Sequence, residues 1–377
     1  MKIAMLGHKR IPSREGGIEI VVEEISTRLA ARGHDVYVYN RKGNYVHGSG
    51  DYCKKIKEYK GVKIIHIPTV KVKGLDALVY SFFAVVRALF GRYDVIHFHA
   101  EGPGVMILFS RLFKIRSVAT VHGLDWQRAK WGSLARKYIK YGEKVIVSRA
   151  DEIIVLSSNN QKYFLDNYSR NTNFIPNGVN KPNTRKASLI TEKYDLHGND
   201  YLLFLSRLVP EKGLDYLIDA FKQIKTDIKL VIAGGSSHSS DYEIRIRKKV
   251  ADDRRIMLTG FVQGELLEEL FSNCKAYIMP SDVEGMPLSL LEAMSYGCSC
   301  LVSDIPENIE VVGDFAITFK KSDTADLQEK LECLLNSGFN AYTPDEIRDY
   351  ALIKYNWDKV VDRHLMIYNN MIEVNRG

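Results

Sequence analysis

Short apolar segments alternate with longer amphipathic segments through the first 175 residues. Residues 2–7 form an apolar run that ends at Gly7, as a buried parallel strand does. Residues 18–32 then repeat apolar side chains at helical spacing until Gly33. The same alternation predicts strands near 35–39, 63–67, 94–99, 117–122, 152–157 and 173–175, and helices near 75–90, 104–113, 134–148 and 159–167. Strands that alternate with helices indicate a parallel sheet covered on both faces.

A second alternating series follows a polar break. Residues 181–200 contain Pro182 and lack an apolar period, which indicates a linker. Strands are then expected near 201–205, 229–233, 255–258, 276–279 and 300–303, and helices near 214–224, 242–251, 266–272, 288–295, 325–336 and 344–370. The fold class is therefore α/β, with two Rossmann-like, doubly wound parallel-sheet domains over 1–180 and 201–356. We expect a C-terminal helix over 357–377 to cross back to the first domain.

The position of the ligand follows from this architecture. Doubly wound sheets bind ligands outside the carboxyl ends of their strands. With two such domains, we expect the site in the cleft between them.

Charge divides the chain into two unlike halves. The net charge of +7 combines +17 over residues 1–190 with −10 over residues 191–377. Such a split supports two units with different partners. The basic half suits nucleic acid, anionic lipid or a polyanionic substrate. Its cations gather in sequence at Arg116, Arg128, Lys130, Arg136, Lys137, Lys140 and Lys144.

Cysteine content and hydropathy narrow the class further. Five cysteines in 377 residues cannot support a disulfide scaffold, which indicates a reducing compartment. The longest apolar stretch, residues 78–90, contains Arg87 and is too short to span a bilayer. The N-terminus reaches polar residues too early for a signal peptide. We expect a cytoplasmic protein, with peripheral association at the inner face of the plasma membrane left open.

The first candidate site lies after the strand at 276–279. Glu284 occupies the loop ahead of a helix that Pro287 is suited to begin, and Glu292 falls in the second turn of that helix. A helix N-terminus suits a phosphate, and carboxylates accept hydrogen bonds from sugar hydroxyls. Alternatively, Glu284 is an ordinary surface carboxylate and Glu292 a solvated one. The apolar neighbours of Glu292 argue for a buried position that needs a partner.

The second candidate is the segment 206–213, which follows the first strand of the second domain. Arg207 and Lys212 precede Gly213 and a helix, an arrangement that suits a diphosphate. The simpler interpretation is a pair of solvated loop cations.

The first domain offers weaker signals. Gly16 and Gly17 follow its first strand and let a backbone approach a ligand closely. His122 ends a strand and is suited to donate to a sugar hydroxyl or to move a proton, although a lone histidine is more often structural. Asp125, three residues on, can act as a base or as a surface cap.

Together these residues resemble the retaining nucleotide-sugar glycosyltransferases of family 4, which have the GT-B fold. Glu284 and Glu292 match the E-x7-E motif of that family, within E-G-M-P-L-S-L-L-E. Arg207 and Lys212 match its phosphate-binding pair, and Gly16-Gly17 its N-terminal glycine loop. The first 130 residues look like a narrower bacterial subgroup that includes rhamnosyltransferases of capsule and cell-wall polysaccharide assembly.

The resemblance implies a role for each residue. Arg207 and Lys212 would bind the diphosphate and stabilise the leaving group, Glu292 the ribose, and Glu284 the donor sugar. His122 would lie near the reacting sugar. The remaining substrate-binding candidates are Gly16, Gly17, Asp125, Gly285, Met286, Pro287, Leu288, Phe261 and Val262, the last two beside Gly260 and near the base.

The implied reaction needs no cofactor and no metal, because no D-x-D motif is evident and the two cations replace one. The implied partners are a nucleotide diphosphate sugar and a glycan or lipid-linked glycan acceptor, with an anionic membrane surface left open and no nucleic acid. No protein base is assigned. Two alternatives remain: a GT-B nucleotide-sugar 2-epimerase, with Glu15, Glu19 or Asp125 as acid or base, and a non-catalytic basic adaptor for membrane or nucleic acid.

Overall fold

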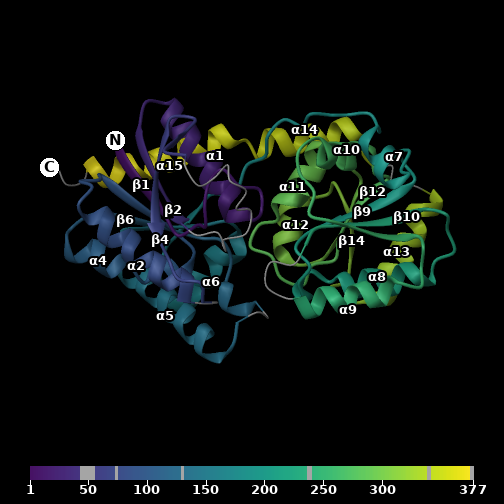
Figure 1. Cartoon of the computed structure of the whole chain (residues 1–377), viewed down its shortest axis with the longest axis horizontal. Helices are drawn as coiled ribbons and strands as arrows, with labels where there is room; N and C mark the ends of the chain where they lie inside the picture. The colour runs from purple at the N-terminus through teal and green to yellow at the C-terminus, as the bar shows by residue number, and fades with distance from the viewer. Residues whose placement is uncertain (43–55, 73–74, 129–130, 236–239, 338–340, 374–377) are drawn as a thin grey trace. The chain divides into compact units, whose positions relative to one another are not determined.

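The computed structural model divides the chain into two compact units. Unit 1 comprises residues 1–177 and 357–377, and unit 2 comprises residues 178–356. The structure describes residues 1–42, 56–72, 75–128, 131–235, 240–337 and 341–373, so Cys53 and Lys130 lie outside the described residues. Helices cover both faces of the sheet in each unit (Figure 1).

Unit 1 is built on a sheet whose described strands run in the order β3-β4-β2-β1-β5-β6-β7-β8. All neighbours pair in parallel except β3 and β4. The strands are β1 (Lys2–Leu6), β2 (Asp35–Lys42), β3 (Glu58–Tyr59), β4 (Val62–Pro68), β5 (Val95–His99), β6 (Arg116–Val121), β7 (Glu152–Val155) and β8 (Asn173–Phe174). The helices are α1 (Gly17–Ala31), α2 (Leu75–Leu89), α3 (Glu101–Gly104), α4 (Ile107–Leu112), η2 (Asp125–Gln127), α5 (Ser133–Arg149), α6 (Ser158–Tyr168) and α15 (Trp357–Glu373).

The core of unit 1 explains why its strands read as continuous apolar runs. Every residue of β5 is buried, as parallel strands covered on both faces require. Tyr80 and Val85 of α2 and Ile146 of α5 pack on one face of the sheet. On the other face, Tyr368 of α15 places its hydroxyl 2.7 Å from Nδ1 of His97.

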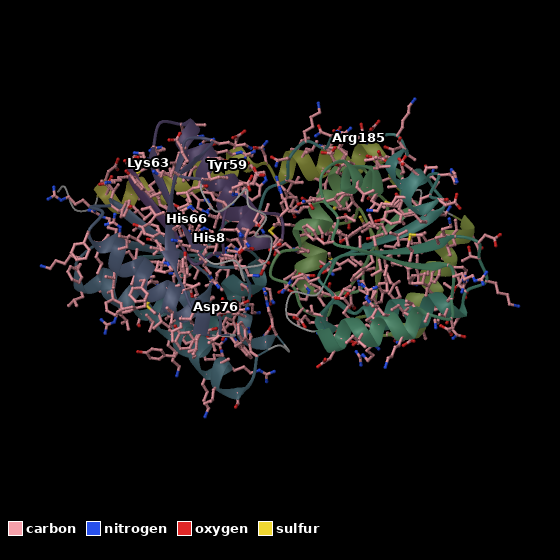
Figure 2. All side chains as sticks on the ribbon, viewed as in Figure 1. His8, Tyr59, Lys63, His66, Asp76 and Arg185 are labelled. Atoms are coloured by element: carbon pink, nitrogen blue, oxygen red, sulfur yellow. The ribbon has the colours of Figure 1, made fainter. Side chains whose placement is uncertain are left out.

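Unit 1 also buries five histidines, which is unusual for a titratable side chain. They are His8, His97, His99, His122 and His364, all at most 8% exposed. Figure 2 shows His8 among the packed side chains of the unit, where its Nε2 lies 3.1 Å from Oδ1 of Asn40. Burial lowers the pKa of His8, His122 and His364 to about 4, because desolvation penalises the charged ring.

Unit 2 contains a parallel sheet in the order β11-β10-β9-β12-β13-β14. Its strands are β9 (Tyr201–Leu205), β10 (Lys229–Ala233), β11 (Ile256–Gly260), β12 (Ala276–Met279), β13 (Cys300–Ser303) and β14 (Ile317–Phe319). Its helices are α7 (Leu189–Tyr194), η3 (Pro210–Lys212), α8 (Leu214–Gln223), α9 (Ser240–Val250), α10 (Glu265–Asn273), α11 (Leu288–Ser295), α12 (Pro306–Val312), α13 (Thr324–Ser337) and α14 (Pro344–Lys354). Two separate apolar clusters lie on the two faces of this sheet.

The segment predicted as a linker, residues 181–200, contains α7. Ile190 of this helix and Leu196 after it are fully buried in one of the two apolar clusters of unit 2. Glu269 of α10 accepts hydrogen bonds from the backbone N–H groups of Ser188 and Ile190, at 2.9 and 3.0 Å. The carboxylate thus satisfies donors at the start of α7, where no residue of the helix can.

Candidate functional site

Two of the predicted motifs meet at the carboxyl edge of the unit 2 sheet. β9 and β12 are neighbours in that sheet, so the loops that follow them leave from the same edge. Arg207 lies in the loop after β9, and Glu284 in the loop after β12. Lys212 ends the short helix η3 in the first of these loops.

An ion pair joins the two loops. Nζ of Lys212 contacts Oε1 of Glu284, although the residues are 72 positions apart in the chain. Their side chains are only 13% and 7% exposed. Glu284 is therefore not the surface carboxylate of the simpler interpretation. A pair so poorly solvated is costly unless each charge keeps a partner, so any anion that takes Lys212 must leave Glu284 with another donor.

Backbone contacts fix the positions of these loops. The backbone N–H of Asp282 donates to the carbonyl oxygen of Glu211 at 2.9 Å. Gly213 has a φ of +67°, and a Cβ there would lie 1.8 Å from the carbonyl oxygen of Pro280. Only glycine permits both the left-handed conformation and this close approach. The glycine after Lys212 thus lets the two loops pack backbone to backbone.

Helix α11 begins at Leu288, the start of the range predicted for it. Pro287 is its N-cap residue rather than its first helical residue, and no side chain caps the helix. Its first N–H groups and positive dipole end can therefore serve an anion. Of the candidates in this segment, Gly285 and Pro287 are buried, whereas Met286 and Leu288 are partly exposed. Glu292 is partly exposed one turn further on.

Tyr277 of β12 lies beneath this site and was not predicted to take part in it. Its hydroxyl donates to the carbonyl oxygen of Leu205 at 3.2 Å and lies 2.9 Å from Oγ of Ser289. Burial, together with the nearby charge of Glu284, holds its pKa well above the usual range. The neutral hydroxyl links the end of β9 to the first turn of α11. An aromatic residue in a buried strand carries no sequence signal for such a role.

The two residues expected near the base have different environments. Phe261 follows the edge strand β11 and is 52% exposed, whereas Val262 is 6% exposed and belongs to the core of unit 2. β10 lies between β11 and β9. Phe261 therefore has a side chain available to a ligand, and Val262 has only its backbone.

In unit 1, the glycine pair starts α1 at the carboxyl end of β1. Gly16 is the N-cap residue and Gly17 the first helical residue. A Cβ on Gly16 would lie 2.2 Å from Oε2 of Glu19. Glu19 is buried and its Oε1 accepts a hydrogen bond from the backbone N–H of Lys9 at 2.9 Å. Glu19 thus holds the loop around the glycines, which is a different task from the acid or base role of the epimerase alternative.

His122 ends β6 and contacts a second buried histidine. Its Nε2 lies 3.0 Å from Nδ1 of His99, at the end of the neighbouring strand β5. Because its pKa is lowered to about 4 by burial, the ring is neutral at pH 7. His122 can therefore take part in hydrogen bonds, but it does not supply a positive charge.

Asp125 is held in place from two sides. Its carboxylate is 3.0 Å from Nε of Arg128, and its backbone N–H donates to Oε2 of Glu101 at 2.8 Å. Glu101 is fully buried after β5, and burial near Asp125 and Glu143 raises its pKa well above the usual range. The carboxyl group of Glu101 thus anchors the loop that follows His122.

Glu143 of α5 completes this anchor. It is fully buried, and its oxygens accept hydrogen bonds from four donors. These donors are Nε1 of Trp126 at 3.1 Å, Nζ of Lys140 at 3.1 Å, the hydroxyl of Tyr163 at 2.9 Å and the hydroxyl of Tyr168. Neither glutamate could be identified from the sequence, because each has the pattern of an ordinary polar residue beside a strand or on a helix.

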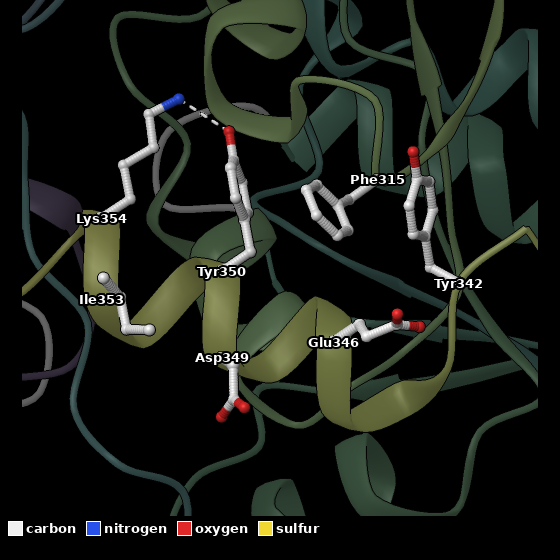
Figure 3. A pocket seen from close by; sticks show the side chains of 7 residues that line it. All are labelled: Phe315, Tyr342, Glu346, Asp349, Tyr350, Ile353 and Lys354. Carbon is white, nitrogen blue, oxygen red and sulfur yellow. Dashed lines mark hydrogen bonds between the residues drawn. The ribbon is translucent and has the colours of Figure 1, made fainter.

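Unit 2 also has a depression that none of the predicted site residues lines. It has a volume of about 440 Å³ and is lined by Phe315, Tyr342, Glu346, Asp349, Tyr350, Ile353 and Lys354 (Figure 3). The Lys354 ammonium donates to the Tyr350 hydroxyl at 2.6 Å, and the ring of Phe315 stacks on that of Tyr350.

Among the residues that the structure describes, no group of three or more His, Cys, Asp or Glu side chains is placed to hold a metal ion. No helix in the same residues is both long and apolar enough to cross a membrane.

Comparisons with known proteins identify the family. The sequence model "Glycosyltransferase Family 4" matches residues 15–181, and the model "Glycosyl transferases group 1" matches residues 188–352. The two matches together cover nearly all of both units. The chain therefore belongs to the family 4 glycosyltransferases, and its two α/β units have the GT-B fold.

Individual relatives agree with this assignment. The UDP-Gal:alpha-D-GlcNAc-diphosphoundecaprenol alpha-1,3-galactosyltransferase of Escherichia coli is 27% identical over 66% of this chain and 67% of its own length. The structure of sucrose-phosphate synthase from Thermosynechococcus elongatus superposes with a TM-score of 0.84 at 21% identity, over 99% of each chain. That of HepE from Anabaena, solved with UDP-glucose, has a TM-score of 0.80 at 18% identity, over 98% of this chain and 100% of that one. These two structures support the fold alone.

Proposed function

We propose that the chain is a retaining, metal-independent hexosyltransferase that acts in the cytoplasm. Its donor is a nucleotide diphosphate sugar, and its acceptor is a lipid-linked glycan of cell-surface polysaccharide assembly. The observation that carries the proposal is the contact between Lys212 and Glu284, which brings the two motifs of unit 2 to one place. The name of the Escherichia coli relative, with its diphosphoundecaprenol acceptor, supports the lipid-linked acceptor. HepE with bound UDP-glucose supports the donor class.

Charge development explains the use of two cations. When the bond between the anomeric carbon and the diphosphate oxygen breaks, negative charge grows on the diphosphate and positive charge on the sugar. Arg207, Lys212 and the N-terminus of α11 are fixed positive groups that oppose the first charge without reorganisation. Arg207 offers a planar fork and Lys212 a point charge, so the two can hold different oxygens.

The two carboxylates accept hydrogen bonds from the hydroxyl groups of the donor. Lys212 exchanges Glu284 for the diphosphate when the donor binds, and Glu284 then accepts hydrogen bonds from the sugar hydroxyls. Glu292 accepts from the ribose hydroxyls. Gly285, Met286, Pro287 and Leu288 form the backbone turn at the phosphate, and Phe261 and Val262 border the base. Each buried charge keeps a partner in both states, as its desolvation requires.

Unit 1 contributes a glycine backbone, a neutral histidine and a carboxylate. The backbone at Gly16 and Gly17 approaches the donor, neutral His122 exchanges a hydrogen bond with the sugar, and Asp125 borders the acceptor. We assign no protein base. The leaving phosphate oxygen accepts the proton of the acceptor hydroxyl as that hydroxyl attacks the same face of the sugar, which retains the anomeric configuration.

A donor screen tests this function. We expect one of the UDP-, dTDP- or GDP-sugars, with dTDP-rhamnose as our first candidate, to raise the melting temperature. The same compound should then lose its sugar to a polyprenyl-diphosphate glycan in the presence of a chelator. An altered sugar formed without acceptor would indicate the epimerase instead. A failure of every nucleoside diphosphate to bind at millimolar concentration would indicate the non-catalytic adaptor.

A further inference from the structure

Helix α2 is apolar on the side that faces away from the protein. Tyr80, Ala84, Val85 and Ala88 cover the sheet, as expected for the inner face of an amphipathic helix. The outer side nevertheless exposes Leu75, Leu78, Phe82 and Phe83, and then Phe90 directly after the helix. Phe90 is 76% exposed. The outer face of a helix in a globular protein is normally polar, so this composition needs an explanation.

Helix α4 extends the same surface. It exposes Leu108 and Leu112, and Phe113 directly after it, with 76% of Leu112 accessible. The rings of Phe82 and Phe109 pack edge to face with centroids 5.8 Å apart, which joins α2 to α4. The two helices are neighbours on one side of the unit 1 sheet (Figure 1). We call this combined surface the α2–α4 face.

The topology of the sheet places the ends of the two helices at one edge. α2 leads into β5 and α4 leads into β6, and these strands are parallel neighbours with Val95 opposite Arg116. Each helix therefore ends at the amino edge of the sheet. Each also ends with an exposed phenylalanine followed by a cation: Phe90 precedes Arg92, and Phe113 precedes Lys114.

Charges around the α2–α4 face are mostly positive. Arg87, Arg92, Arg111 and Lys114 are exposed along the two helices and their ends, against one exposed carboxylate, Asp94. Arg111 pairs with Asp151 at 3.1 Å. The other acid of α2, Asp76, is paired with Arg41 at 3.0 Å. An anionic surface therefore meets an excess of positive charge here.

We propose that the α2–α4 face binds an anionic lipid bilayer, with its phenylalanine and leucine side chains at the acyl boundary and its cations among the headgroups. Helices that lie on membranes combine an apolar side with Lys and Arg at its rim, which is the arrangement observed. Protein interfaces also concentrate aromatic residues and Arg, so the cations at the rim, rather than the phenylalanines, favour a bilayer over a second copy of the chain. The proposal goes beyond the enzymatic function and does not depend on it.

Vesicle flotation of the full chain tests the proposal. The probes are phosphatidylcholine vesicles with and without phosphatidylglycerol. Wild-type protein should bind the anionic vesicles at least about tenfold more tightly than the neutral ones, because each cation near the surface contributes to attraction. High salt should weaken this preference.

Two variants locate the binding surface. The double variant Phe90→Ser/Phe113→Ser should lose most vesicle binding, and Arg92→Glu/Lys114→Glu should lose the preference for anionic lipid. All four positions are exposed, so the melting temperature should change little. Leu165→Ser on α6 and Ile353→Ser on α14 remove side chains that are 50% and 66% exposed elsewhere, and both should bind as wild type does.

Several results would overturn the proposal. They are absence of wild-type binding to anionic vesicles, equal binding to both vesicle types, and binding that survives both double variants. Sedimentation of a wild-type dimer that Phe90→Ser/Phe113→Ser dissociates, without vesicle binding, would instead assign the face to a second copy of the chain. Because vesicle binding needs no donor or acceptor, its failure is distinguishable from failure of the enzymatic proposal.

Discussion

The Lys212 ammonium has two successive partners in our account, Glu284 before the donor binds and the diphosphate afterwards. The first partner is visible in the structure and the second is proposed. Both charges lie in a poorly solvated position, where removal of one leaves the other exposed to the full desolvation cost.

We predict that Lys212→Ala lowers kcat by about 10²–10³-fold, the usual loss when one fixed donor to a developing anion is removed. The readout is transfer from the nucleotide sugar that the screen identifies. Lys222→Ala is the matched control, because Lys222 of α8 pairs with Asp252 on the surface of the same unit. Wild-type turnover by Lys212→Ala, or an equal loss in the control, would refute the assignment.

Gly213 makes a second prediction possible at this scale. Gly213→Ala should destabilise the protein by about 1–3 kcal/mol, because φ is +67° and the new Cβ would collide with the carbonyl oxygen of Pro280. Denaturant unfolding measures the change. Gly235→Ala is the control, since a Cβ there would meet no heavy atom within 4 Å. Equal stability of the two variants would show that the loops do not depend on this approach.

Part of the site could be predicted from the sequence, because some of its residues lie close together along the chain. Arg207, Lys212 and Gly213 stand within one loop, and Glu284 and Glu292 within one loop and helix, so their spacing could be read directly. The network around Glu101 and Glu143 could not be predicted, because the two glutamates are 42 positions apart and their partners come from other elements. Nothing in the sequence indicates that either carboxylate is buried.

Among the elements, most strands and helices were predictable, including the two-residue strand β8, and those that were missed are short. β3 and β14 have two and three residues, too few to show a period. The helix expected over 104–113 is the shorter α4, Ile107–Leu112, and the four-residue helix α3 that precedes it was not predicted. Helix α7 was not predicted, because it has six residues and only one of them, Ile190, is buried, so its sequence shows no apolar period.

Glu101, the first residue of α3, leads to a prediction about the pH dependence of stability. Since the pKa of Glu101 is raised in the folded state, its contribution to stability is complete below pH 4.5 and is lost as pH rises. The free energy of unfolding of wild type relative to Glu101→Gln should therefore fall between pH 5 and pH 8. Urea unfolding of both proteins measures the difference. A difference that stays constant over this range would mean that Glu101 is ionised.

At the scale of the whole molecule, acid should act on unit 1 first. Burial lowers the pKa values of the five histidines, so the stability they contribute is present above pH 6.5 and is lost as pH falls below it. The raised pKa of Glu101 makes its contribution to stability grow as pH falls, but it is one group and the histidines are five.

Tryptophan fluorescence can isolate this effect. Trp126, Trp131 and Trp357 are the three tryptophans of the chain, and all belong to unit 1. Tryptophan fluorescence reports the unfolding of unit 1, and circular dichroism reports the unfolding of both units. Between pH 7 and pH 5, the melting temperature from fluorescence should fall more than the melting temperature of the transition seen by circular dichroism alone, which belongs to unit 2. A larger fall in the transition that fluorescence does not detect would contradict the prediction.

Binding of a nucleoside diphosphate is the most direct test of the central claim, which is that unit 2 holds a nucleotide sugar through the loops joined by Lys212 and Glu284. Calorimetric titration with UDP, dTDP and GDP should show one ligand that binds wild type and Lys222→Ala equally, and Lys212→Ala at least about tenfold more weakly, since a charge-assisted hydrogen bond is lost. Equal affinity of Lys212→Ala and wild type for that ligand would contradict the account.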